Sequence, residues 1–417
     1  MKRYCCLILL SLATTLSVVA QETADSLQTE PVIEDSASFV QVGMLVAEPS
    51  YQHPQSSFGH AFLRMQCPSE GLDYCFSMES GDYEGFLDIC LGNYPNRLVC
   101  IPTEEYIASF NDEGRCVTEY PLNLRLEEAQ RLWRLLDETC ASGSSPYHDF
   151  FHHGCSQELV RLLVQALDGS IELGKASEAF GNTILVIGNQ NLPADSWLHL
   201  TTFLLTTDGT DRQLSPLEKT LIPCIIPSLF SDARIVEADG SSRQLLQERA
   251  PRMFSPHKPQ PEDASMPLWV WFALLLAATL LISFAAHQWK SEGIRRFAFG
   301  WDVVLFVAYN TITFTLLILA ALSTLPTLHG WNWNFLLYNP LPLVLWLYSC
   351  RHPQGKSLRV FYRCYAVWTA LFIGGMLLVS NHQILEQYLM ALCFGSRCLF
   401  KAGSYPLQTK QINNNPQ

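Results

Sequence analysis

A cysteine at the predicted start of a helix is the residue best suited to covalent chemistry in this chain. Apolar residues follow Cys155 at steps of three and four, and they are Leu159, Leu162, Leu163 and Ala166. Unpaired N–H groups and the positive end of the helix dipole favour a thiolate at such a position, and can lower a thiol pKa from about 8.5 to roughly 3.5–7.5. The alternative is a structural cysteine, buried or disulfide-bonded.

A base for this thiol is found upstream. A nucleophilic cysteine needs a base within hydrogen-bond reach, and often a third polar group that orients the base. His60 begins a predicted strand, His60 to Met65, and is the candidate base. Ser77 and Glu79 follow on the next predicted strand and are candidates for the third group, although both have an alternative as ordinary surface residues.

Other polar residues are candidates for the substrate site. His153 lies two positions before Cys155, beside His152, and is a candidate for shaping an acyl site or a plain loop histidine. Arg64 is a candidate for binding a lipid phosphate, with an ordinary ion pair as its alternative. Asn332, like Asn334, lies between tryptophans near a predicted membrane face, where it lines a substrate entrance or simply anchors the segment.

The elements around these residues mix strands and helices. Strands are predicted over 39–46, 60–65, 72–78 and 122–124, and helices over 126–139, 156–167 and 194–205. Ser215-Pro216-Leu217-Glu218 has the cap, first-turn proline and capping-box glutamate of a further helix start. The pattern predicts an α+β domain over 39–248.

The composition indicates a membrane protein with a soluble middle part. The chain is 48% hydrophobic and 16% charged, and the apolar excess lies at the start and over the last 150 residues. Residues 1–20 have the plan of a signal peptide and 21–38 that of a flexible leader. A proline-rich linker is predicted over 249–266 and a tail over 401–417. The net charge of −12 argues against a nucleic-acid partner.

Residues 267–400 are predicted to form an all-α transmembrane domain of four or five helices. A crossing needs about 20 apolar residues, and candidates cover 267–289, 303–325, 335–349, 365–380 and 384–400. Glu386 and Arg397 make the last candidate the least certain of these to span. Basic residues follow the first and third candidates, whereas 326–334 has no lysine or arginine. This positive-inside pattern places the middle domain outside the cytoplasm, which in a bacterium is the periplasm.

The cysteines of the exported part leave pairing open, because an oxidising compartment permits disulfides but sequence does not fix the connectivity. They are Cys67, Cys75, Cys90, Cys100, Cys116, Cys140, Cys155 and Cys224. No two form a CxxC, and none matches a histidine pair at zinc-finger spacing, so the sequence predicts no metal site.

The stretch Phe58-Gly59-His60-x-Phe62-Leu63-Arg64, followed by Gly154-Cys155-Ser156-x-x-Leu159-x-x-Leu162, resembles the periplasmic domain of the bacteroidete-type lipoprotein N-acyltransferases. The resemblance extends to the membrane part, where His329-Gly330-Trp331-Asn332-Trp333-Asn334 precedes a proline-containing span. It implies a circularly permuted papain-like domain, with histidine before cysteine in the chain.

The resemblance further implies acyl transfer without a metal or diffusible cofactor. Cys155 would take an acyl chain from a membrane phospholipid, with His60 as base, and pass it to the α-amino group of an apolipoprotein's diacylglyceryl cysteine. Two rival functions remain. One is a membrane-anchored cysteine peptidase or amidase acting on cell-wall peptide. The other is a non-catalytic assembly module in which Cys155 forms a disulfide, for example with Cys140.

Overall fold

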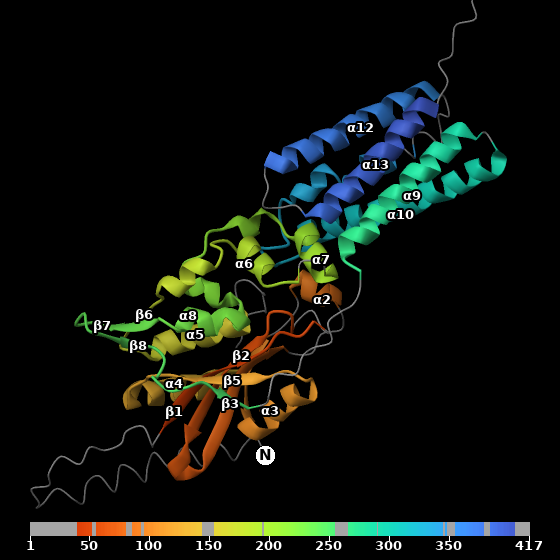
Figure 1. Ribbon diagram of the computed structural model, residues 1–417. Coiled ribbons are helices and arrows are strands. Elements are labelled where there is room, and N and C mark those ends of the chain that lie inside the picture. The colour runs from red at the N-terminus through yellow and green to blue at the C-terminus, as the bar shows by residue number, and fades with distance from the viewer. Residues whose placement is uncertain are drawn as a thin grey trace, which may run out of the picture.

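A computed structural model gives the arrangement of the chain (Figure 1). It describes residues 40–51, 56–80, 86–92, 96–143, 154–193, 196–254, 266–289, 291–344, 347, 355–378 and 384–404. The predicted signal peptide, the leader, most of the linker and nearly all of the tail lie outside these residues. A domain of strands and short helices stands at one end, and a bundle of long helices stands at the other.

An antiparallel sheet forms the framework of the first domain. In the described part of the chain it has six strands in the order β4-β3-β2-β1-β5-β9. Their bounds are β1 Gln41–Ala47, β2 His60–Cys67, β3 Leu72–Ser80, β4 Asn96–Pro102, β5 Val117–Pro121 and β9 Arg252–Met253. β9 lies within the first residues of the predicted linker, so the sheet extends further along the chain than expected.

Helices cover the sheet, with α4 and α5 packing against each other and α5 against β2 and β3. The helices of this domain are α2 Phe86–Leu91, α3 Thr103–Asp112, α4 Leu126–Ser142, α5 Cys155–Ala166, α6 Ile184–Gln190, α7 Trp197–Leu205 and α8 Ile226–Phe230. Short 3-10 turns are η3 Pro68–Glu70, η4 Lys175–Ala179, η5 Asp208–Asp211, η6 Leu217–Leu221 and η7 Pro223–Ile225. The predicted α+β class is confirmed.

The helix predicted from the Ser215 capping box is a 3-10 turn. The backbone N–H of Ser215 donates to the Glu218 carboxylate over 2.7 Å, so the capping contact itself is present. The strand predicted at Leu122 to Leu124 is wrong, because β5 ends at Pro121 and Leu122 makes only an isolated bridge to Leu246.

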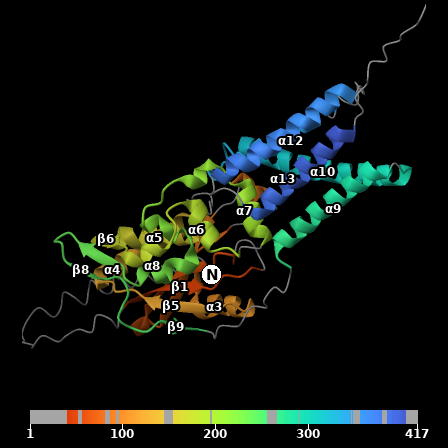
Figure 2. The same ribbon diagram turned by 45° about the horizontal axis from the view of Figure 1, so that its top comes forward.

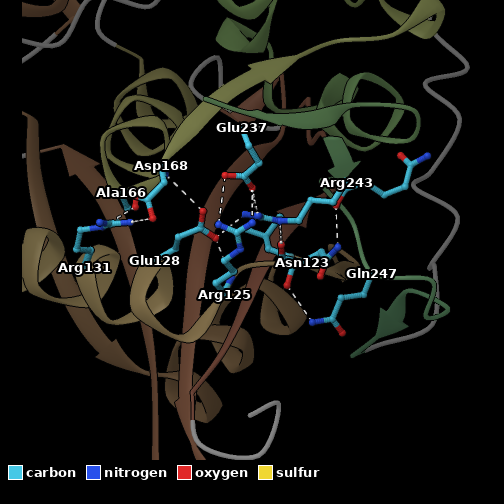
Figure 3. Close-up of polar contacts among 11 residues, drawn as sticks. Asn123, Arg125, Glu128, Arg131, Ala166, Asp168, Glu237, Arg243 and Gln247 are labelled. Carbon is cyan, nitrogen blue, oxygen red and sulfur yellow. Dashed lines mark hydrogen bonds and ion pairs between the residues drawn. The ribbon is translucent and has the colours of Figure 1, made fainter. Parts of the chain in front are cut away.

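A small second sheet is connected to α4 by ion pairs between charged side chains (Figure 3). It consists of β6 Gly169–Glu172, β7 Arg234–Glu237 and β8 Ser242–Gln244. The fully buried Glu128 accepts from Arg243 over 2.5 Å, and Arg243 also contacts Glu237 on β7. Glu128 additionally caps its own helix by accepting from the Arg125 N–H over 2.8 Å. The Glu128 carboxylate therefore caps the N-terminus of α4 and also binds β8 to this helix.

The bundle contains α9 Leu268–Gln288, α10 Glu292–Leu322, η8 Trp333–Leu336, α12 Gly355–Leu378 and α13 Leu385–Ser404. Three helices are long and apolar enough to cross a membrane: α9, α10 and the Leu358–Leu378 part of α12. α13 packs along α9 and α12 (Figures 1 and 2). Of the candidate span 335–349, the structure describes 335–344 and 347: residues 335–336 end η8, and 341–344 are helical.

Candidate active site

The nucleophile candidate occupies the first turn of α5, as its spacing predicts. α5 begins at Cys155, and Gly154 before it is extended. The Glu158 N–H donates to the Gly154 carbonyl over 3.2 Å, which closes the first turn. Leu159 and Leu163 are fully buried in the core, so the helix is pinned against the sheet with Cys155 at its end.

The base candidate is the first residue of β2, where β1 and β2 pair His60 with Ala47. The chain reaches this point through Gly59, whose φ is +80°. A Cβ on Gly59 would lie 2.7 Å from the Ala47 carbonyl oxygen and 3.4 Å from Cys224 Cβ. Only glycine fits this approach, so the conformation that introduces His60 depends on it.

The two candidates meet. The Cys155 thiol is hydrogen-bonded to the His60 ring, and the sulfur also accepts from the Ala61 backbone N–H. His60 Nε2 also faces oxygen atoms of Ser77, Glu79 and Tyr106. The ring packs against Phe62 and Phe110, at centroid distances of 5.9 and 6.0 Å, and these two rings stack on each other at 5.4 Å. The imidazole is therefore held by its strand backbone and by packing against this aromatic pair.

The third-group candidates both lie at the far edge of the His60 ring. His60 Nε2 is 2.7 Å from Ser77 Oγ and 3.5 Å from Glu79 Oε1. The β2–β3 register pairs Leu63 with Phe76, and three further steps along both strands set His60 opposite Glu79. The Ser77 hydroxyl donates to Glu79 Oε1 over 2.8 Å. Cys155, His60 and the Ser77–Glu79 pair thus form one chain of contacts.

Tyr106 is a member of this group that the sequence analysis did not identify. It lies on α3, and its hydroxyl donates to Glu79 and is 2.8 Å from Ser77 Oγ and 3.2 Å from His60 Nε2. Its ring packs edge-on against Phe62 at 4.8 Å. The spacing of Tyr106, Ile107 and Phe110 is that of a buried helix face, and it was the available signal.

The charges in the site stabilise one another. Burial raises the pKa of Cys155, but the charge and hydrogen bond of His60 outweigh it and lower that pKa below its usual value. Burial likewise lowers the pKa of His60, while Cys155 and Glu79 raise it overall. Burial raises the pKa of Glu79, yet His60, Tyr106 and Ser77 lower it to about 2. These shifts favour a thiolate–imidazolium pair next to an ionised carboxylate.

Arg64 lies on the same strand as His60, but its side chain binds carboxylates outside the candidate site. Its guanidinium donates to Asp73 over 2.8 and 2.5 Å and to Glu119 over 2.9 Å. It also lies 5.2 Å from the Phe254 ring centroid. Only 5% of its side chain is exposed, and the arrangement is the ordinary ion pair of the alternative interpretation.

Asn332 joins the two parts of the chain. Its side chain donates to the Leu204 carbonyl at the end of α7 over 2.9 Å and accepts from the Asn334 N–H over 2.8 Å. Asn334 in turn donates to the Phe203 carbonyl over 3.1 Å. His152 and His153 lie outside the described residues. The structure thus brings together Cys155, His60, Ser77 and Glu79, and places Arg64 and Asn332 in structural contacts.

Every exported cysteine of the sequence analysis has a free thiol in the structure, including Cys140 and Cys155. The Cys140–Cys155 disulfide of the assembly-module alternative is therefore not formed. Burial raises the pKa of Cys140 and of Cys224 to about 11. Cys155 differs from both, because its pKa is lowered.

Comparisons with known proteins identify both parts of the chain. A family model described as the Lnb N-terminal periplasmic domain matches residues 33–202, and one described as the Lnb transmembrane domain matches residues 260–405. No curated protein and no solved structure matches the chain. The protein is accordingly an inner-membrane protein with a periplasmic domain. The chain belongs to the Lnb family, the bacteroidete-type lipoprotein N-acyltransferases.

Proposed function

We propose that the protein moves an acyl chain from a membrane phospholipid, through a thioester on Cys155, to the α-amino group of an apolipoprotein's diacylglyceryl cysteine. The product is a triacylated lipoprotein. The observation that carries the proposal is the hydrogen bond between the Cys155 thiol, at the start of α5, and His60. Membership of the lipoprotein N-acyltransferase family supplies the substrate class.

In the first half-reaction the Cys155 thiolate attacks the ester carbonyl of the phospholipid. The carbonyl oxygen becomes an oxyanion, for which the Cys155 backbone N–H at the helix start is a suitable donor. When the tetrahedral intermediate collapses, the C–O bond of the ester breaks. The imidazolium of His60 gives its proton to the departing alkoxide, so the lysophospholipid leaves as an alcohol and the acyl chain stays on sulfur.

In the second half-reaction the neutral α-amino group attacks the thioester carbonyl. His60, now neutral, accepts a proton from the attacking nitrogen, and the C–S bond breaks to give the amide and a thiolate. The thiolate–imidazolium pair is thereby restored. Glu79, with Ser77 and Tyr106, is proposed to orient the His60 ring and to stabilise its cationic form. The mechanism needs no metal or diffusible cofactor.

We also assign the periplasmic domain to the permuted papain-like fold. The support is an antiparallel sheet whose histidine strand precedes the helix that begins with the nucleophile. We place α13 across the membrane with α9, α10 and α12, because it is 20 residues long and packs along α9 and α12. With the segment 335–349 the domain would have the predicted four or five helices.

Mass spectrometry of the N-terminal peptide of a lipoprotein tests the function. Cells that carry Cys155→Ser should lose the amide-linked acyl chain and keep the diacylglyceryl group. Cys140→Ser is the matched control, since Cys140 is also a free, partly buried thiol in the same domain, and it should leave the peptide triacylated. An unchanged peptide in Cys155→Ser cells, with the protein at normal level and no second N-acyltransferase active, would overturn the proposal and direct attention to cell-wall peptides.

A further inference from the structure

A cavity of about 590 Å³ lies among α10, α12 and α13, and its volume is in the range of ligand pockets, roughly 300–1,000 Å³. Most of its wall is apolar or aromatic, including Phe306, Phe361 and Phe394. An apolar space this large costs stability when it is empty, because its lining loses packing contacts. The structure therefore offers room for a long apolar ligand inside the bundle.

The cavity lies on the cytoplasmic side of a contact between α10 and α12. The hydroxyl groups of Tyr309 on α10 and Tyr365 on α12 are hydrogen-bonded to each other and line one end of the cavity. The other lining residues of α10 and α12 come earlier in each helix, towards the ends that face away from the periplasmic domain. The two helices thus meet at the tyrosines and leave the cavity beyond them.

Charged side chains line the opposite end. Asp302 is paired with Arg397 at 2.5 and 3.1 Å and with Lys401 at 2.6 Å. Arg397 also donates to Ser283 Oγ over 3.0 Å and to the Ala298 carbonyl over 3.4 Å. Among the described lining residues, one carboxylate thus faces two cations, which leaves this end of the cavity with a net positive charge.

This charged end lies far from the catalytic domain. α10 ends at Leu322, and the next residue, Ser323, donates to the Cys90 carbonyl over 2.7 Å at the periplasmic domain. Asp302 is twenty residues (322 − 302) before that end, which is about 30 Å along a helix and about the thickness of a hydrocarbon core. The positive end therefore belongs to the cytoplasmic leaflet.

The cavity is open towards the bilayer. Phe299, Val303 and Val307 line it and follow one another at four-residue steps along α10. They are also 64%, 45% and 57% exposed on the outer surface of the bundle. A chain that enters between them would pass directly from the acyl region of the membrane into the cavity.

We propose that this cavity binds one phospholipid of the cytoplasmic leaflet. An acyl chain lies along the aromatic wall, and the phosphate lies against Lys401 and Arg397, whose net charge it neutralises. Lys401 is the principal phosphate donor, because its ammonium carries three N–H groups and one contact to Asp302 leaves the others available. This lipid is not the acyl donor, since it is on the opposite side of the membrane from Cys155. It fills the space between α10 and α12 and fastens them together.

Native mass spectrometry of the full-length protein tests this site. The protein is reconstituted in vesicles of equimolar phosphatidylethanolamine and phosphatidylglycerol, extracted in a mild detergent, and weighed for bound lipid. Val303→Trp places a large ring in the cavity mouth, and Val304→Trp is its matched control, because Val304 is 57% exposed on the same helix and does not line the cavity. Lys401→Gln removes the phosphate donor without adding bulk.

The wild type and Val304→Trp should each retain one phospholipid, and Val303→Trp should retain none. Lys401→Gln should bind it about tenfold more weakly, as expected for loss of one charge-assisted hydrogen bond. Equal retention by the two tryptophan variants, a wild type without phospholipid, or a bound fatty acid or detergent in its place would each overturn the proposal. The readout is lipid content, so it does not depend on the transfer activity proposed above.

Discussion

The Tyr106 hydroxyl donates to the same Glu79 oxygen that lies 3.5 Å from His60 Nε2. A strand and a helix, β3 and α3, therefore contact one histidine and share one carboxylate. The Cys155 thiol is hydrogen-bonded to the same histidine. A change at Tyr106 or Glu79 is expected to reach Cys155 mainly through the orientation and charge of His60.

Glu79→Gln should lower the rate of N-acylation about a hundredfold, because the amide cannot stabilise the imidazolium as the carboxylate does. Tyr106→Phe should lower it about tenfold, since it removes one hydrogen bond to a charged group. Tyr120→Phe, on β5 and outside this group, should be neutral. Transfer from phospholipid to a lipoprotein peptide by purified protein measures the three rates. A neutral Glu79→Gln would exclude Glu79 as an orienting group.

Alkylation of Cys155 should have an unusual pH dependence. The thiolate reacts, and the pKa of Cys155 is lowered, so the rate with iodoacetamide should rise at a lower pH than for an ordinary cysteine near 8.5. In His60→Ala the two largest contributions that lower the pKa of Cys155 are lost and burial remains, so the rise should move to higher pH than in the wild type. Cys140, with its pKa raised to about 11, serves as the control within each sample. The peptides are quantified by mass spectrometry, and an unshifted His60→Ala profile would contradict the pairing.

Arg64→Met should destabilise the periplasmic domain rather than weaken lipid binding. It leaves Asp73 and Glu119 without their partner, and removing one member of a buried pair costs about 3–5 kcal/mol, at the lower end here because 37% of the Asp73 side chain is exposed. Arg161→Met, which breaks an exposed pair with Glu158, should cost about 0.5 kcal/mol or less. Denaturant unfolding measures both. Unchanged stability combined with lost N-acylation would return Arg64 to the substrate site.

Gly209→Ala should disturb the junction between the periplasmic domain and the bundle. Its Cβ would lie 2.6 Å from the Pro326 carbonyl oxygen, a backbone atom next to the Thr207–Thr327 hydrogen bond. Gly188→Ala is the control, because a Cβ there meets no atom within 4 Å. Limited proteolysis should cleave near this junction faster in Gly209→Ala only, and N-acylation should fall with it. Equal protection of the two variants would mean that the junction tolerates the shift.

Local patterns were sufficient to predict the elements that carry the candidate pair, Cys155 and His60. The α5 start at Cys155 follows from the apolar spacing behind it, and the β2 start at His60 follows from alternation after a glycine. Both signals lie within about ten residues of the atom concerned. The contact between them was inferred from chemistry, since a thiol nucleophile needs a base, and not from any property of the intervening chain.

Tyr106 escaped prediction because its role depends on the sheet. Its own helix pattern is plain, but only the pairing of β4 with β3 brings α3 to the edge where Glu79 lies. β5 was misplaced for a related reason. Glu119 faces inward and is 8% exposed because Arg64 pairs with it, and a charged residue in an inward position breaks the alternation that marks a strand.

The second membrane helix was predicted too short. α10 begins at Glu292, whereas the apolar run suggested a start near Val303. Arg295 and Arg296 lie in its first turns, outside the apolar run, and hydropathy does not register helical residues beyond the bilayer core. Asp302 lies where the apolar run starts, and its partner Arg397 is one of the two residues, with Glu386, that argued against 384–400 as a span. A charge on one helix is thus explained only by its partner on another.

The segment that leads from α10 into η8 is hydrogen-bonded to the periplasmic domain near both of its ends. Ser323 and Thr324 are bonded to carbonyl groups at the end of α2, and Asn332 and Asn334 to those at the end of α7. These contacts at two separate points oppose tilting of the periplasmic domain relative to the bundle. We therefore expect Cys155 to keep a constant distance from the membrane surface. In the proposed reaction, lipid substrates would come to Cys155 by lateral diffusion in the plane of the membrane. The depth at which the ester or amine lies in the bilayer would then decide whether the sulfur can reach it.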